Sequence, residues 1–172
     1  MERLQLRIPA FDELWYRQRM LADAATMSYN RGYDLPFDGY NRETGCIAFG
    51  PEQWREWYDR WIGREPDRFY AYIVRRSDGA LIGEVCLRRQ ETEGWHEMGI
   101  VVEARHRGQG YAAEALRLLL DHAFYKLGAE AVHNHFEQER AAALRIHLNA
   151  GFQVICRENG LLGLLLTRAH YL

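Results

Sequence analysis

Hydrophobic and polar positions change their period several times along the first part of the chain. Polar and apolar residues alternate over residues 3–8, which predicts a short strand. Apolar residues then recur with helical spacing over residues 11–22 and again after Pro51, where proline and an acidic residue suit the first turn of a helix. Residues 28–50 are rich in Gly, Asn, Asp and Tyr without a clear period, and they predict a loop.

From residue 68 onward, strand patterns alternate with helical ones. The expected elements are strands at 68–76, 80–89 and 95–102, a helix from Gly108 to about Leu127, a strand at 130–136, a helix at 139–149, and strands at 152–158 and 161–168. Turn residues separate them, most clearly Asn159-Gly160, a strong hairpin signal. The order β-α-α-β-β-β-α-β-α-β-β predicts a single domain of the α/β (α+β) class.

Charge and cysteine content narrow the function classes. The 172 residues include 22 basic and 24 acidic side chains, so the formal net charge is −2. A near-neutral chain without a basic block disfavours a nucleic-acid partner. The apolar runs are short, which disfavours a membrane partner. Three cysteines without metal-type spacing fit a reduced, cytoplasmic protein.

The segment from Val101 to Ala112 combines a strand end, a basic turn with two glycines and the start of a helix. Gly108 and Gly110 allow unusual dihedrals and close approach of a ligand to the backbone. Unpaired N–H groups at a helix start favour an anion, and Arg105 and Arg107 add positive charge. The pattern is neither a Walker loop nor a Rossmann fingerprint. It predicts a polyanion site; the alternative is a flexible turn with solvated arginines.

The spacing Arg105-x-x-Gly108-x-Gly110 resembles the signature of the GNAT superfamily of N-acetyltransferases. Residues 95–102 are similar to the central strand of that family, and Gly151-Phe152 resembles the pair that follows its last helix. The resemblance covers residues 68–172 well and residues 1–67 in outline, and is closest to the ribosomal-protein and small-amine acetyltransferases. It implies a mixed central sheet of about seven strands with a C-terminal β-hairpin. Residues 1–67 would form the acceptor side, and residues 68–172 the sheet and the acetyl-CoA-binding core.

What the resemblance implies is an acetyl-CoA-dependent enzyme that acetylates a primary amine by direct attack in a ternary complex. The end of the central strand would pair with the pantetheine arm, where it separates from residues 130–136, and an N–H near Ile100 would stabilise the oxyanion. The following turn would hold the pyrophosphate. The cofactor-binding residues are thus Ile100, Val101, Val102, Arg105, Arg107, Gly108, Gln109, Gly110, Tyr111 and Ala112.

Two carboxylates are candidates for the base that deprotonates the acceptor amine. Glu97 lies on the central strand, where several members of the resembling family place a catalytic glutamate. Glu84 lies in the middle of an apolar strand, where an acid is unusual unless it is paired or functional. For each, the alternative is a carboxylate paired with an arginine. His96 should point to the face opposite Glu97 by strand alternation.

The last helix departs from the family pattern at two positions. His147 stands where many relatives have a tyrosine that donates a proton to the CoA sulfur, and a histidine could serve the same purpose. Alternatively His147 is a packing or surface residue, and CoA leaves as a thiolate. Arg140 replaces the usual asparagine. It could contact CoA, position Glu137 or Glu139, or remain solvated.

The acceptor side is the aromatic part of the chain, because residues 1–75 contain 15 of the 22 aromatic residues. Tyr33 and Asp34 lie in its loop and, with Glu84, are the expected substrate-binding residues, since aromatic and acidic groups suit a cationic amine. The acceptor is therefore expected to be a small-molecule or peptide amine. The sequence leaves the oligomeric state open, a homodimer included.

His133, His135 and Glu137 would share one face of a strand. Such residues more often line a cleft than bind a metal, so the sequence predicts no metal. Two other functions remain open at this stage: a non-catalytic acyl-CoA-binding or regulatory module on the same fold, and another enzyme that binds a phosphate ligand.

Overall fold

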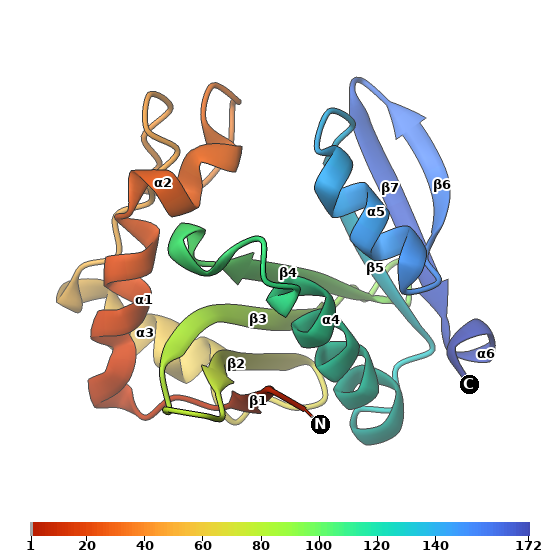
Figure 1. Cartoon of the computed structure of the whole chain (residues 1–172), viewed down its shortest axis with the longest axis horizontal. Helices are drawn as coiled ribbons and strands as arrows, with labels where there is room; N and C mark the ends of the chain where they lie inside the picture. The colour runs from red at the N-terminus through yellow and green to blue at the C-terminus, as the bar shows by residue number, and fades with distance from the viewer. Residues whose placement is uncertain (1) are drawn as a thin grey trace.

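The computed structural model describes residues 2–172 and contains one seven-stranded mixed sheet (Figure 1). Its strands are β1 (Leu4–Arg7), β2 (Arg68–Arg75), β3 (Leu81–Arg89), β4 (His96–Val102), β5 (Ala131–Glu137), β6 (Gln153–Glu158) and β7 (Leu161–Thr167). They are ordered β1-β2-β3-β4-β5-β7-β6 across the sheet. The mixed sheet and the C-terminal β6–β7 hairpin agree with the sequence-based expectation.

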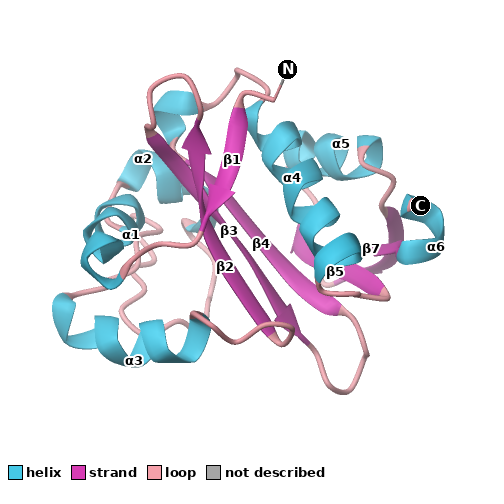
Figure 2. Cartoon of the chain, turned by 90° about the horizontal axis from the view of Figure 1, so that it is seen from below, coloured by secondary structure: helices cyan, strands magenta, loops and turns pink. Residues whose placement is uncertain are grey.

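The helices lie on both faces of this sheet (Figure 2). They are α1 (Leu14–Leu21), α2 (Ala24–Met27), α3 (Pro51–Trp61), α4 (Tyr111–Asp121), α5 (Ala141–Asn149) and α6 (Arg168–Tyr171), with short turns η1 (Phe11–Glu13), η2 (Ser28–Asn30), η3 (Ala104–His106) and η4 (His122–Lys126). Within residues 2–172, no helix is both long and apolar enough to cross a membrane.

Strand alternation divides the core into two layers. On one face, Met98 and Val102 of β4 pack with Leu116 and Leu119 of α4. On the other face, tyrosines of β2 pack with Tyr16 of α1 and with partly buried tryptophans of α3. The tryptophan pattern of α3 therefore covers the sheet, and the expected acceptor-side segment lies on the face opposite α4.

The sheet opens between its two parallel strands. All other neighbouring pairs are antiparallel, whereas β4 and β5 pair in parallel only at His96 with Val132 and at Glu97 with His133. Figure 1 shows the two strands running apart from this shared end. From Met98 to Val102, the side of β4 that faces β5 is therefore not paired with it, and an opening lies between the two strands in the middle of the sheet.

The sequence misplaced several local boundaries. Residues 24–27, which were assigned to no element, form α2, because the Asp23 carboxylate accepts a hydrogen bond from the Thr26 amide at 3.2 Å and caps the helix. The first three residues of the expected loop, Ser28–Asn30, form the turn η2. Helix α4 begins at Tyr111 instead of Gly108, since Gly108 and Gly110 adopt φ of 75° and 79°. It continues through the π-type turn η4 to Lys126, close to the expected end.

Candidate active site

The backbone of β4 presents donors along the opening. The Glu103 amide donates to the carbonyl of Ile82 on β3 at 2.9 Å, and the β3–β4 register continues without a shift. In an antiparallel pair, alternate residues bond to the same neighbour, so Val101 and Gly99 also face β3. The N–H groups of Met98, Ile100 and Val102 therefore point toward the diverging β5.

The glycine turn at the end of this edge leads directly into α4. Gly108 and Gly110 both occupy the left-handed region, and Gly110 is the N-cap residue. A Cβ added to Gly108 would meet no protein atom within 4 Å, so the surface of the turn is open there. The first N–H groups of α4 have no partner within the helix, and they make this turn suitable for an anion.

The two arginines of the turn behave differently. Arg105 is held by the buried carboxylate of Glu103, with Nε 2.6 Å from Oε2, and its side chain is largely exposed. Arg107 folds back onto α2, donating to the carbonyls of Val102 at 3.1 Å and Thr26 at 2.6 Å. Burial lowers the pKa of Arg107. The guanidinium of Arg107 is thus engaged by backbone carbonyls, whereas that of Arg105 is largely exposed.

Arg3 is a further cation beside the turn, and it was not among the predicted site residues. Its guanidinium donates to the carbonyl of Gln109 at 2.9 Å, pairs with Glu114 at 2.9 Å and lies 4.8 Å from the centroid of the Tyr111 ring. Arg3 precedes the turn by more than a hundred residues. Only the packing of β1 against α4 brings it there, and no local pattern in the sequence indicates that contact.

Glu97 lies at the shared end of β4 and β5, between two histidines of β5. Its two carboxylate oxygens lie 2.6 Å from His133 Nδ1 and 2.7 Å from His135 Nδ1. Glu97 and His133 side chains are 15% and 13% exposed, whereas His135 is 61% exposed. Trp95 stacks on the His133 ring at 4.5 Å. Strand alternation groups these histidines with Glu137, whereas the structure joins them to Glu97.

The electrostatics of this cluster favour an ionised Glu97. Burial alone would raise the pKa of Glu97, but the hydrogen bonds from His133 and His135 lower it below its ordinary value. In the other direction, the hydrogen bond to Glu97 raises the pKa of His135. His96 points to the opposite face, as expected, where Nε2 lies 2.9 Å from the carbonyl of Pro66.

Glu84, the second candidate base, is paired with an arginine. Arg17 of α1 lies 2.5 Å from the Glu84 carboxylate, and the Tyr70 hydroxyl donates to the same group. The Arg17 guanidinium also lies over the rings of Trp57 at 4.7 Å and Phe49 at 5.0 Å. The arrangement matches the alternative interpretation of Glu84 as a paired carboxylate within the aromatic core.

His147 is only 3% exposed. Its Nδ1 lies 2.8 Å from the carbonyl of Ala143, which can only accept, so Nδ1 carries the proton. Its Nε2 lies 3.0 Å from the Asn134 side-chain amide. Burial lowers the pKa of His147. A neutral histidine with both nitrogens engaged matches the packing interpretation and is poorly suited to donate a proton to CoA.

The loop of the expected acceptor side contacts the β5–α5 turn. The Tyr33 hydroxyl donates to Glu139, and the hydrogen bond raises the pKa of Tyr33 to about 12. The Arg140 guanidinium lies 4.7 Å from the Tyr29 ring centroid and 3.6 Å from Glu137. Asp34 is 88% exposed and 3.3 Å from Arg42. Arg140 is therefore a contact between the two sides rather than a solvated residue.

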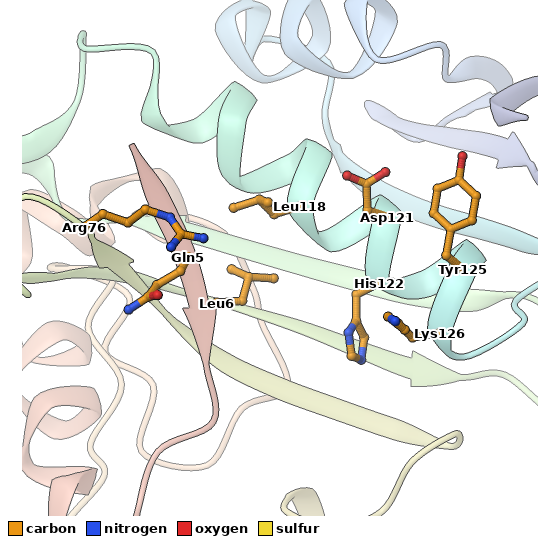
Figure 3. A pocket seen from close by; sticks show the side chains of 8 residues that line it. All are labelled: Gln5, Leu6, Arg76, Leu118, Asp121, His122, Tyr125 and Lys126. Carbon is orange, nitrogen blue, oxygen red and sulfur yellow. The ribbon is translucent and has the colours of Figure 1, made fainter. Parts of the chain in front are cut away.

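A surface pocket lies on another part of the molecule (Figure 3). Its lining side chains come from β1, from Arg76 just after β2, and from the end of α4 with η4, where they include Leu118, His122 and Tyr125. It contains no residue of the expected acetyl-CoA turn. The candidate site is therefore the opening between β4 and β5.

Comparisons with known proteins agree with this geometry. The family model described as acetyltransferase (GNAT) domain matches residues 3–153, and the chain belongs to this family. The expected class, an acetyl-CoA-dependent N-acetyltransferase, is thereby confirmed. No curated protein matches the chain.

Solved structures show the same fold. Spermidine N-acetyltransferase from Vibrio cholerae in complex with CoA and spermine superimposes with a TM-score of 0.78 at 19% identity, covering 99% of this chain and 99% of that one. A GNAT-family acetyltransferase from Bacillus anthracis has a TM-score of 0.72 at 17% identity, with coverage of 98% and 96%.

Proposed function

We propose that this N-acetyltransferase transfers an acetyl group from acetyl-CoA to a primary amine of a small polycation, by direct attack within a ternary complex. The observation that supports this most is the opening between β4 and β5, which begins at Glu97 and ends at the glycine turn. A thioester donor, an amine acceptor and a base can meet along that edge. Acetyl-CoA supplies the activated acyl group.

The residues present fit the cofactor. The open turn around Gly108 and the start of α4 offer backbone donors for a pyrophosphate, and Arg105 and Arg3 add positive charge on its borders. The edge of β4 from Met98 to Val102 offers hydrogen-bonding groups for a pantetheine arm. In this arrangement the Ile100 N–H stabilises the oxyanion that forms when the amine attacks.

Glu97 is the proposed base. Its lowered pKa keeps the carboxylate ionised at neutral pH. Ile100 follows Glu97 by three residue steps along the strand, which corresponds to roughly 10 Å along the backbone. Over that distance Glu97 acts through water, and His135, the exposed partner, relays the proton to solvent. The CoA thiolate is a tolerable leaving group near neutral pH, so the step needs no proton from His147.

The acceptor side suits a flexible cation. Two exposed acids, Asp34 and Glu139, lie beside Tyr33: Asp34 follows it in the chain, and Glu139 accepts a hydrogen bond from its hydroxyl. A flexible polycation binds favourably to carboxylates, through opposite charge, and to aromatic faces, through cation–π contacts. The structurally similar protein from Vibrio cholerae was solved with spermine, which adds weight to a polyamine as acceptor here.

The proposal is tested by incubating the protein with acetyl-CoA and a panel of amines, followed by mass spectrometry. The panel contains spermidine, spermine, an aminoglycoside and a peptide with a free N-terminus. We expect mono-acetylated polyamine and stoichiometric release of CoA. Acetylation of the peptide alone would overturn the acceptor class. Tight CoA binding without any transfer would favour the non-catalytic module.

A further inference from the structure

We propose that Glu97, His133 and His135 form a binding site for a divalent transition-metal ion of the Zn²⁺ type, and that occupancy of this site inhibits acetylation. The binding part stands on the geometry of the three side chains. The inhibitory part rests on the proposed function, because it assumes that Glu97 is the base.

The donor set is of the kind that binds zinc. One ligand atom from each residue, a ring nitrogen of each histidine and a Glu97 oxygen, can be chosen so that all lie within 4.8 Å of one another. Two imidazoles and a carboxylate are ligands that Zn²⁺ accepts in sites that keep a further position open. Without the metal, the Nδ1 atoms of the two histidines form the short hydrogen bonds to Glu97 at 2.6 and 2.7 Å.

The strands hold these donors in place. Glu97 and His133 are register partners at the point where β4 and β5 pair, and His135 follows two residues later on the same face. Trp95 stacks on one side of the His133 ring, and Gly163 of β7 lies against its Nε2. Two of the three ligands are therefore fixed by backbone and packing before any ion arrives.

The cluster is also accessible from one side. His135 is 61% exposed, which leaves a route for the ion and room for water in the remaining coordination positions. The charges around the cluster are mixed, because Glu137 lies on the same strand face and Arg88 is the register partner of Glu97 on β3. The ionised Glu97 supplies the negative charge that the ion needs.

The protons balance without a further reactant. A neutral imidazole that binds through Nδ1 moves its proton to Nε2 by way of water, and a protonated His135 releases one proton to solvent. The Glu97 carboxylate changes from accepting two N–H bonds to coordinating the ion. It then no longer accepts a proton from the acceptor amine, and acetylation stops while the metal is bound.

The experiment is a titration of tag-free, metal-free protein with Zn²⁺ by calorimetry, with Mg²⁺ as the contrasting ion. We expect one Zn²⁺ per chain and no heat with Mg²⁺, since imidazole ligands disfavour Mg²⁺. His135→Ala and Glu97→Gln should each weaken binding at least tenfold. His170→Ala and Cys156→Ser are matched controls, because they remove an exposed histidine and the exposed thiol elsewhere, and they should bind as the parent does.

Because His135 is exposed, its variant folds even if the His133→Ala variant does not. Zinc binding that persists in His135→Ala and Glu97→Gln, or its absence in the parent, would overturn the site. The functional consequence is measured separately: Zn²⁺ should inhibit acetylation at the concentration that fills the site. A protein that binds Zn²⁺ as expected but acetylates no amine would refute the proposed function and leave the metal site standing.

Discussion

Replacing Gly108 with alanine separates the geometry of the glycine turn from its role in binding. Gly108 has φ of 75°, and an added Cβ would meet no protein atom within 4 Å. The cost to the folded chain is thus the left-handed backbone alone, about 1–2 kcal/mol. For a protein of this size, that cost lowers Tm by about 2–8 °C.

Gly79, in the turn between β2 and β3, is the matched control. Its φ is 72°, and its Cβ would likewise meet open space. Gly79→Ala should therefore lower Tm by a similar amount. The two variants differ in one respect, since the Cβ at position 108 projects into the space assigned to the pyrophosphate and the Cβ at position 79 does not.

A thermal-shift assay with acetyl-CoA measures this difference. At one hundred times Kd, the ligand stabilises the parent by about 2.7 kcal/mol, a rise in Tm of roughly 5–11 °C. A tenfold weaker Kd in Gly108→Ala reduces the stabilisation to about 1.4 kcal/mol. Gly79→Ala should keep the full shift. An unchanged shift in Gly108→Ala, or an equal loss in both variants, would refute the assignment of the turn.

Four further predictions concern side chains. Arg17→Ala leaves a buried carboxylate unpaired and should lower the free energy of unfolding by about 3–5 kcal/mol in a urea titration; a loss below 1 kcal/mol would contradict the buried pair. In Glu97→Gln, the pKa of His135 measured by NMR should fall toward its ordinary value, since the carboxylate that raises it is gone. In the parent, the stabilisation from the pair of His135 and Glu97 is full below the ordinary histidine pKa and is lost as pH rises through the raised pKa of His135. Over this pH range, Tm of Glu97→Gln should therefore vary less with pH than Tm of the parent. Tyr33→Phe should raise the acceptor KM and leave acetyl-CoA affinity unchanged. His147→Leu should lower stability but keep kcat of the folded protein; a kcat loss of a hundredfold or more would restore His147 as the acid.

Features of the fold that depend on local pattern could be predicted from the sequence. Alternation over 95–102 and the glycines at 108 and 110 place a strand, a turn and a helix in the right order, because each signal is contained within a few residues. Helix α2 was missed because a single capping residue, Asp23, decides it. Such a short helix has too few positions to show a period.

The site was harder to predict, because its contacts join residues far apart in the chain. Arg107 and Arg105 have the same charge and similar positions in the turn, yet one braces α2 and the other faces solvent. Glu84 and Glu97 are both strand carboxylates on the same face, and only packing gives the first an arginine and the second two histidines. The link from Glu97 to His133 did have a signal, because the family resemblance implies that residues 95–102 and 130–136 are neighbouring strands.

The most direct test of the central claim is a crystal structure of the protein with acetyl-CoA. We expect the pyrophosphate at the turn from Arg105 to Ala112 and the pantetheine along β4, with the thioester oxygen within hydrogen-bonding distance of the Ile100 N–H. A cofactor bound elsewhere, such as in the pocket of Figure 3, would contradict the account. So would a thioester on the far side of the sheet from Glu97.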